Sequence, residues 1–187
     1  ERRAMKAERE TVDRLVAQTG LSAAIYGMVS MNAQIFMHKT GNQPIVTSNP
    51  KGISSGLQDQ LANSAAGRLL LSTVSQQRRD GLIRRLNAEA AEDRKFSTVE
   101  MAQQMESCRN TRMAHGAAGF GTNVDSCCML LPGHLDSQPL VVGLMYKPDG
   151  EADHAVLLDC LRDAVERLSR PAESGVEPIQ LRSSVAA

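Results

Sequence analysis

Cysteine and histidine side chains are the first candidates for chemistry in this sequence. The cysteines are Cys108, Cys127, Cys128 and Cys160, and the histidines are His38, His115, His134 and His154. The adjacent Cys127 and Cys128 lack the spacing of a zinc knuckle, and the histidines form no HxH or HxxxH pair. We therefore expect no metal ion and no other cofactor. Cys128 paired with His115 is an alternative, because a base beside a thiol activates it as a nucleophile.

Motifs for nucleotide binding and hydrolysis do not occur in the sequence. It contains no Walker loop, dinucleotide fingerprint, zincin motif or nucleophile elbow. Gly119-Phe120-Gly121 is a Gly-x-Gly fragment without a strand before it and a helix after it, so it predicts a turn. We expect no catalytic residues here.

The segment 63–67 is the second place where the residue types could bind a ligand. Asn63 or Ser64 can cap a helix, and Ala65, Ala66 and Gly67 follow with small side chains. Such a helix start leaves backbone N–H groups open and attracts carboxylates or phosphates. A capped helix packed tightly on a sheet would have the same residues, so the local pattern leaves both interpretations open.

Helices and strands in separate blocks must position these residues. A helix over 4–19 ends at Gly20, and period-two alternation in 33–39 pairs this segment with 23–29 as a β-hairpin. One helix is predicted from the cap at 63 or 64 to 71, and a second over 75–90. A third begins at the capping box Ser97–Glu100 and ends near His115, and a last helix covers 151–169. Strands are predicted at 127–131 and 140–146, with a short edge strand at 44–47. The fold class is therefore α+β, with one antiparallel sheet covered by helices.

The composition suits one folded domain without an excess of either charge. The chain has 187 residues, of which 42% are hydrophobic, and its 21 basic residues balance its 21 acidic residues. A DNA-binding domain usually carries a basic surface, so we do not expect these residues to contact nucleic acid. No apolar run approaches the roughly 20 residues of a membrane span, so no membrane partner is expected. Reduced cysteines and the lack of a signal peptide predict a cytoplasmic protein.

Four segments in order resemble the effector-binding, C-terminal domain of IclR-type bacterial transcriptional regulators. Residues 12–20 (VDRLVAQTG) resemble the family's opening helix, and 61–68 (LANSAAGR) resemble its Leu-His-Ala-Thr/Ser-x-x-Gly-Lys segment. Residues 128–132 (CMLLP) resemble its Cys-x-Ala-x-Pro strand, and 139–148 (PLVVGLMYKP) resemble its final strand. The resemblance covers roughly residues 2 to 169. It implies a fold related to GAF and PAS sensors, with a curved antiparallel sheet flanked by helices.

The resemblance also implies a site in which a small organic acid lies over the sheet and its carboxylate faces the helix start. Carried over by position, the effector-binding residues are Ser64, Ala65, Ala66, Ala118, Cys128, Leu144 and Tyr146. Ala62 replaces the family's usual histidine, and Leu144 and Tyr146 replace two serines. Such a pocket is more apolar than one for glyoxylate or pyruvate. A larger or aromatic acid therefore fits better, unless effector binding has been lost.

The resemblance further implies how the chain is organised. We expect a linker and opening helix at 1–20, the effector-binding domain at 21–170 and a flexible tail at 171–187. The family carries a winged helix-turn-helix domain upstream. This domain is not among these residues, so DNA would be contacted through the missing part of a longer protein.

Two functional hypotheses follow from the sequence. In the first, the chain is a non-enzymatic sensing domain that binds an organic acid, self-associates as a dimer or tetramer, and controls transcription. In the second, it is a GAF-like enzyme that uses Cys128 as a redox or nucleophilic thiol.

Overall fold

The computed structural model describes residues 5–132, 138–150 and 152–170. The helices are α1 (Lys6–Thr19), α2 (Ala65–Leu71), α3 (Gln76–Glu89), α4 (Thr98–Thr111) and α5 (His154–Leu168), with short 3-10 turns at Leu61–Asn63 and Glu92–Arg94. The strands are β1 (Ser22–Val29), β2 (Asn32–Lys39), β3 (Gln58–Gln60), β4 (Met113–Ala117), β5 (Asp125–Leu130) and β6 (Leu140–Tyr146). The predicted α+β class is confirmed.

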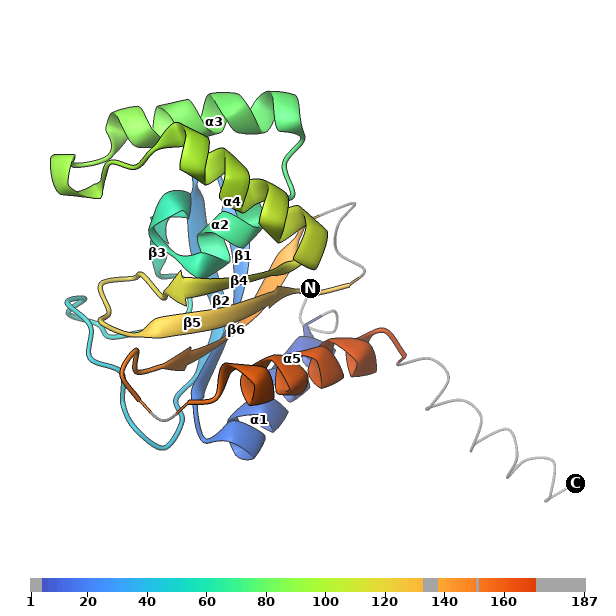
Figure 1. Ribbon diagram of the computed structural model, residues 1–187. Coiled ribbons are helices and arrows are strands. Elements are labelled where there is room, and N and C mark those ends of the chain that lie inside the picture. Colours follow the sequence, from blue (N-terminus) through green and yellow to red (C-terminus); the bar gives the residue numbers. More distant parts are fainter. Residues whose placement is uncertain (1–4, 133–137, 151, 171–187) are drawn as a thin grey trace, which may run out of the picture.

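One antiparallel sheet runs through the molecule in the order β3-β2-β1-β6-β5-β4. Its strands turn strongly from β1 and β2 to β4 and β5, which gives the sheet a curled shape (Figure 1). Helices α2, α3 and α4 lie on one side of the sheet, and α1 and α5 lie on the other (Figure 1). Each sheet face therefore has its own hydrophobic core. We call these the α2-side core and the α5-side core.

Local signals account for the ends of several elements. Gly20, with φ of 71°, ends α1 in the left-handed conformation that glycine adopts easily. The Ser97 hydroxyl accepts a hydrogen bond from the Glu100 N–H, as a capping box requires. The hairpin of β1 and β2 is joined by a two-residue turn, in which Ser30 has a positive φ. These sequence-based predictions are confirmed.

The two edges of the sheet differ from the prediction. Residues 44–47 form no strand, and only Thr47 makes an isolated bridge, to Thr122. The strand at that edge is β3. At the other edge, α4 ends at Thr111 because Arg112 takes the left-handed conformation, and the chain turns back as β4, where the sequence predicted helix. The predicted tail at 171–187 lies outside the described residues.

Candidate functional site

The predicted helix start forms, and α2 packs its start tightly against its surroundings. The Ser64 hydroxyl accepts a hydrogen bond of 2.9 Å from the Gly67 N–H, which caps the helix. Ala65 and Ala66 are buried in the α2-side core. A β-carbon at Gly67 would collide with the backbone of Leu61. The small residues of this segment therefore allow close backbone packing, which is one of the two interpretations that the sequence left open.

The segment 118–121 covers the start of α2. Ala118 is buried in the same core, and its N–H donates to the Val124 carbonyl at 2.9 Å. The Phe120 N–H donates to the Asp59 carboxylate at 2.7 Å. Phe120 has a φ of 55°, between two glycines that are also left-handed, so the predicted turn is confirmed. A β-carbon at Gly119 would crowd both Asp59 and Ser64. This turn therefore lies directly against the helix cap.

Cys128 lies on the same face of the sheet, in a fully buried polar cluster. Its sulfur is 3.1 Å from the Ser126 hydroxyl, and the Tyr26 hydroxyl also interacts with Ser126. Burial raises the pKa of the Cys128 thiol to about 12. The Tyr26 ring packs against the Phe120 ring, with centroids 5.8 Å apart. Aromatic rings and the thiol thus fill the space between α2 and the sheet.

Leu144 and Tyr146 do not belong to this cluster, so their placement beside Cys128 is wrong. Both lie in the α5-side core, on the opposite face of the sheet. Side chains alternate between faces along a strand, and in β6 the positions that face α2 are Val141, Gly143 and Met145. Gly143 is paired with Cys128 across β5 and β6. A shift of one residue in the carried-over register accounts for the error.

Cys128 and His115 are not a catalytic pair in this structure. His115 on β4 is paired with Cys127, whereas Cys128 is paired with Ala114, so Cys128 and His115 point to opposite faces. A thiol with a raised pKa and no base beside it holds almost no thiolate at neutral pH. Among the described residues, no group of three or more His, Cys, Asp or Glu side chains could hold a metal ion.

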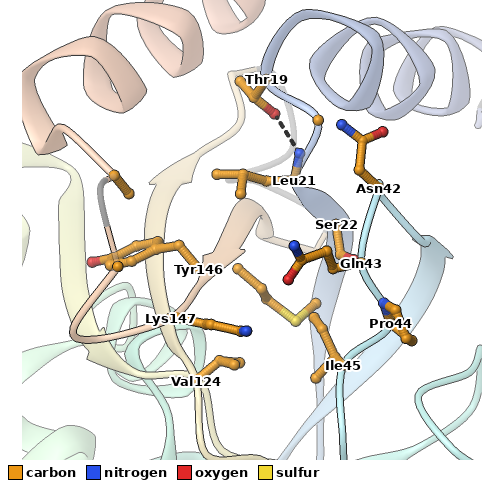
Figure 2. Close-up of a pocket in the computed structure, with 14 residues that line it drawn as sticks. Thr19, Leu21, Ser22, Asn42, Gln43, Pro44, Ile45, Val124, Tyr146 and Lys147 are labelled. Atoms are coloured by element: carbon orange, nitrogen blue, oxygen red, sulfur yellow. Dashed lines mark hydrogen bonds between the residues drawn. The ribbon is translucent and has the colours of Figure 1, made fainter.

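A cavity of about 310 Å³ opens at the end of the sheet, close to the buried cluster (Figure 2). Its apolar walls include Leu21, Pro44, Ile45, Val124 and Met145. Ile45, Val124 and Met145 also pack in the α2-side core, and the Val124 carbonyl accepts a hydrogen bond from the Ala118 N–H. Lys147 extends its amino group toward the middle of the cavity (Figure 2). The walls of this cavity are therefore mainly apolar.

A second hollow, of about 420 Å³, lies at the β4 edge of the sheet. We call it the Arg68 groove, and its polar lining consists of Arg68 from α2, Gln104, Ser107 and Thr111 from α4, His115 from β4 and His154 from α5. None of these six side chains is acidic. The groove is separate from the cavity in Figure 2, because the two share no lining residue.

Solved structures with the same architecture identify the fold. The effector domain of the transcriptional regulator IclR from Acinetobacter sp. ADP1 matches with a TM-score of 0.75, over 89% of this chain and 98% of that domain, at 22% identity. The fold is that of an IclR effector domain. The Thermotoga maritima IclR has a TM-score of 0.74 and 13% identity, over 89% of this chain and 67% of its own. No protein-family model and no curated protein matches the sequence.

An inducer-binding domain is also among the matches to the IclR effector fold. A double mutant of the inducer-binding domain of the PobR transcription factor from Acinetobacter, in complex with 3-hydroxybenzoic acid, has a TM-score of 0.68 and 12% identity. The match covers 88% of this chain and 94% of that domain. The structural neighbours of this chain are therefore ligand-binding domains of transcriptional regulators, as the resemblance in sequence predicted.

Sequence reasoning missed several residues that the IclR effector fold brings together. Gly143 and Met145 were missed because every residue of β6 is buried, so no polar alternation marks its two faces. Tyr26 was missed because it stands in an apolar strand without a motif. Arg68 was missed because it stands where the family segment that 61–68 resembles has a lysine, which by itself indicates no binding role. None of the described helices combines the length and the hydropathy that a bilayer-spanning helix requires.

Proposed function

We propose that this chain is the effector-sensing domain of an IclR-type transcriptional regulator and that its effector is a small organic acid. The observation that carries the proposal is the shared fold, which spans 98% of an IclR effector domain. The neighbour in complex with 3-hydroxybenzoic acid supports an acid, and specifically an aromatic one, as the class of effector.

In this proposal the domain acts on DNA through a winged helix-turn-helix domain of the longer protein. The equal numbers of acidic and basic residues agree with this division, because the DNA-reading domain would supply the basic surface. A regulator of this kind works in the cytoplasm. The sensing domain self-associates as a dimer or tetramer, and its zero formal net charge does not oppose association.

We place the effector's acidic group between α2 and the sheet, at Ser64, Ala65, Ala66, Ala118 and Cys128. This position is supported because Ala65, Ala66, Ala118 and Cys128 belong to the α2-side core, and Ser64, which caps α2, is also buried. The effector has to displace the Phe120 turn, which crowds the cap of α2. That turn strains a phenylalanine in the left-handed region, which costs roughly 1–2 kcal/mol relative to an ordinary conformation. Its displacement therefore releases strain.

The apolar body of the effector would extend toward the cavity in Figure 2. Val124 joins the two places, because its carbonyl accepts from Ala118 and its side chain lines the cavity. Met145 lies at the boundary, and its flexible thioether can move aside. With Gly143 and Met145 at the positions facing α2, the walls offer few hydrogen bonds. A tiny oxoacid would be held weakly, so an aromatic acid such as a hydroxybenzoate is favoured.

A thermal-shift screen tests the proposal. Benzoate, hydroxybenzoates and aliphatic acids of the same length are compared, and the best compound is titrated. At 100 times its Kd, a ligand stabilises the folded state by about 2.7 kcal/mol, which raises Tm by several degrees.

Ala66→Leu is the variant that locates the site, because a larger side chain would occupy the space of the acidic group. Ala88→Leu on the exposed face of α3 is the matched control. We expect the ligand-induced shift to disappear in Ala66→Leu and to persist in Ala88→Leu. Equal shifts in both variants would show that the effector binds elsewhere, and the absence of a shift with every acid would contradict the proposed function.

A further inference from the structure

We propose that the Arg68 groove is a second binding site, for a small organic anion whose carboxylate or phosphate pairs with the Arg68 guanidinium. This site lies at the β4 edge of the sheet and is distinct from the proposed effector site. The two proposals therefore stand or fall separately.

Arg68 is a half-buried cation without a charged partner. Its guanidinium makes one long hydrogen bond, 3.4 Å from Nη1 to the Ala62 carbonyl. No carboxylate of the described residues lies within 4.0 Å of the guanidinium. Arg79 shows the contrast, because its buried guanidinium is 3.3 Å from Glu106 and also reaches backbone carbonyls. A guanidinium has five N–H donors, so most of those of Arg68 are available to an anion.

The backbone of β4 makes room for this cation. A β-carbon at Gly116 would lie 2.8 Å from Nη2 of Arg68. The side chain of Arg68 thus crosses from α2 to the edge strand over a residue that has no side chain. Burial lowers the pKa of the Arg68 guanidinium, as expected for a cation removed from water without compensation. An anion in the groove would supply the missing compensation.

The rest of the groove suits an anion attached to an apolar body. Ser107 and Gln104 stand three residues apart on one face of α4 and add neutral hydrogen-bonding groups. His115 and His154 are exposed residues of the groove lining, with ring centroids 5.5 Å apart. The groove lining also includes the apolar side chains of Cys108, Met113 and Leu158. The volume of about 420 Å³ is that of a small-molecule site.

Histidine NMR offers a direct test, because the chain has four histidines and two of them line the groove. Benzoate, phenyl phosphate and uncharged benzyl alcohol are titrated while the imidazole C–H resonances are followed. We expect both anions to shift His115 and His154 and to leave His38 unmoved. His38 lies on β2, and three strands of the sheet lie between β2 and β4. The relative affinities of benzoate and phenyl phosphate show which anionic group the site prefers.

Arg68→Met should weaken binding at least tenfold, and Arg78→Met on the exposed face of α3 should leave it unchanged. If Arg68→Met does not fold, Arg68→Lys replaces it. Loss of the planar fork should then weaken benzoate more than phenyl phosphate. Unchanged affinity in the Arg68 variant, equal shifts with benzyl alcohol, or no shift up to about 10 mM anion would overturn the proposal.

Discussion

Cys128 should resist alkylation in the native protein, and this prediction separates the two hypotheses drawn from the sequence. Its side chain has no exposed surface, and burial raises its pKa from the ordinary 9.0 to about 12. At about pH 7.5 this rise alone lowers the thiolate fraction roughly a thousand-fold. Because the reagent also has to reach the sulfur, labelling requires local or global opening of the structure.

The assay is iodoacetamide labelling followed by mass spectrometry of the peptides over time. Cys160, which is partly exposed on α5, serves as the internal control and should react first. Cys128 should react at least about a thousand times more slowly, and urea below the unfolding transition should accelerate it because labelling follows opening. After complete unfolding, both thiols should react at similar rates.

Native labelling of Cys128 within about tenfold of Cys160 would refute this reasoning. It would mean that the thiol is accessible and ionised, and the enzyme hypothesis would regain support. Labelling could instead be slow in the native state and not be accelerated by urea. That result would mean that the reagent reaches Cys128 without any opening of the structure, which contradicts the role given to burial.

Three further predictions follow from the packing of the core. The folded state keeps Cys128 protonated above the ordinary thiol pKa of 9.0, so its contribution to the free energy of unfolding should be full below about pH 9 and fall by roughly 1.4 kcal/mol per pH unit above it. Urea unfolding at pH 8 and pH 10 should therefore show a smaller loss of stability for Cys128→Ala than for the parent protein. Gly67→Ala should lower the free energy of unfolding by about 1–3 kcal/mol, because the added methyl group meets the backbone of Leu61, and an unchanged urea midpoint would contradict this. Light scattering should give a multiple of the 20.2 kDa chain mass at micromolar concentration, and a monomer at every concentration would count against self-association.

The sequence by itself determines the elements whose signals are local. Gly20 after an apolar stripe predicts the end of α1, the alternation in 33–39 predicts the hairpin, and Ser97 with Glu100 predicts the start of α4. Each signal acts between residues close in the chain, so it can be recognised without tertiary information. The order of four motifs also indicated the IclR effector fold, although none of them alone is specific.

Only the tertiary structure decides which side chains share a face or a cavity. β6 is buried on both sides, so its sequence lacks the alternation that would have placed Gly143 and Met145, rather than Leu144 and Tyr146, beside Cys128. The edge strand β4 depends on pairing with β5, a partner that the local pattern does not reveal. Arg68 becomes a candidate anion site only where α2, α4 and β4 meet. Packing between distant segments determines these features, because burial, pairing and uncompensated charge arise from neighbours that the linear order does not specify.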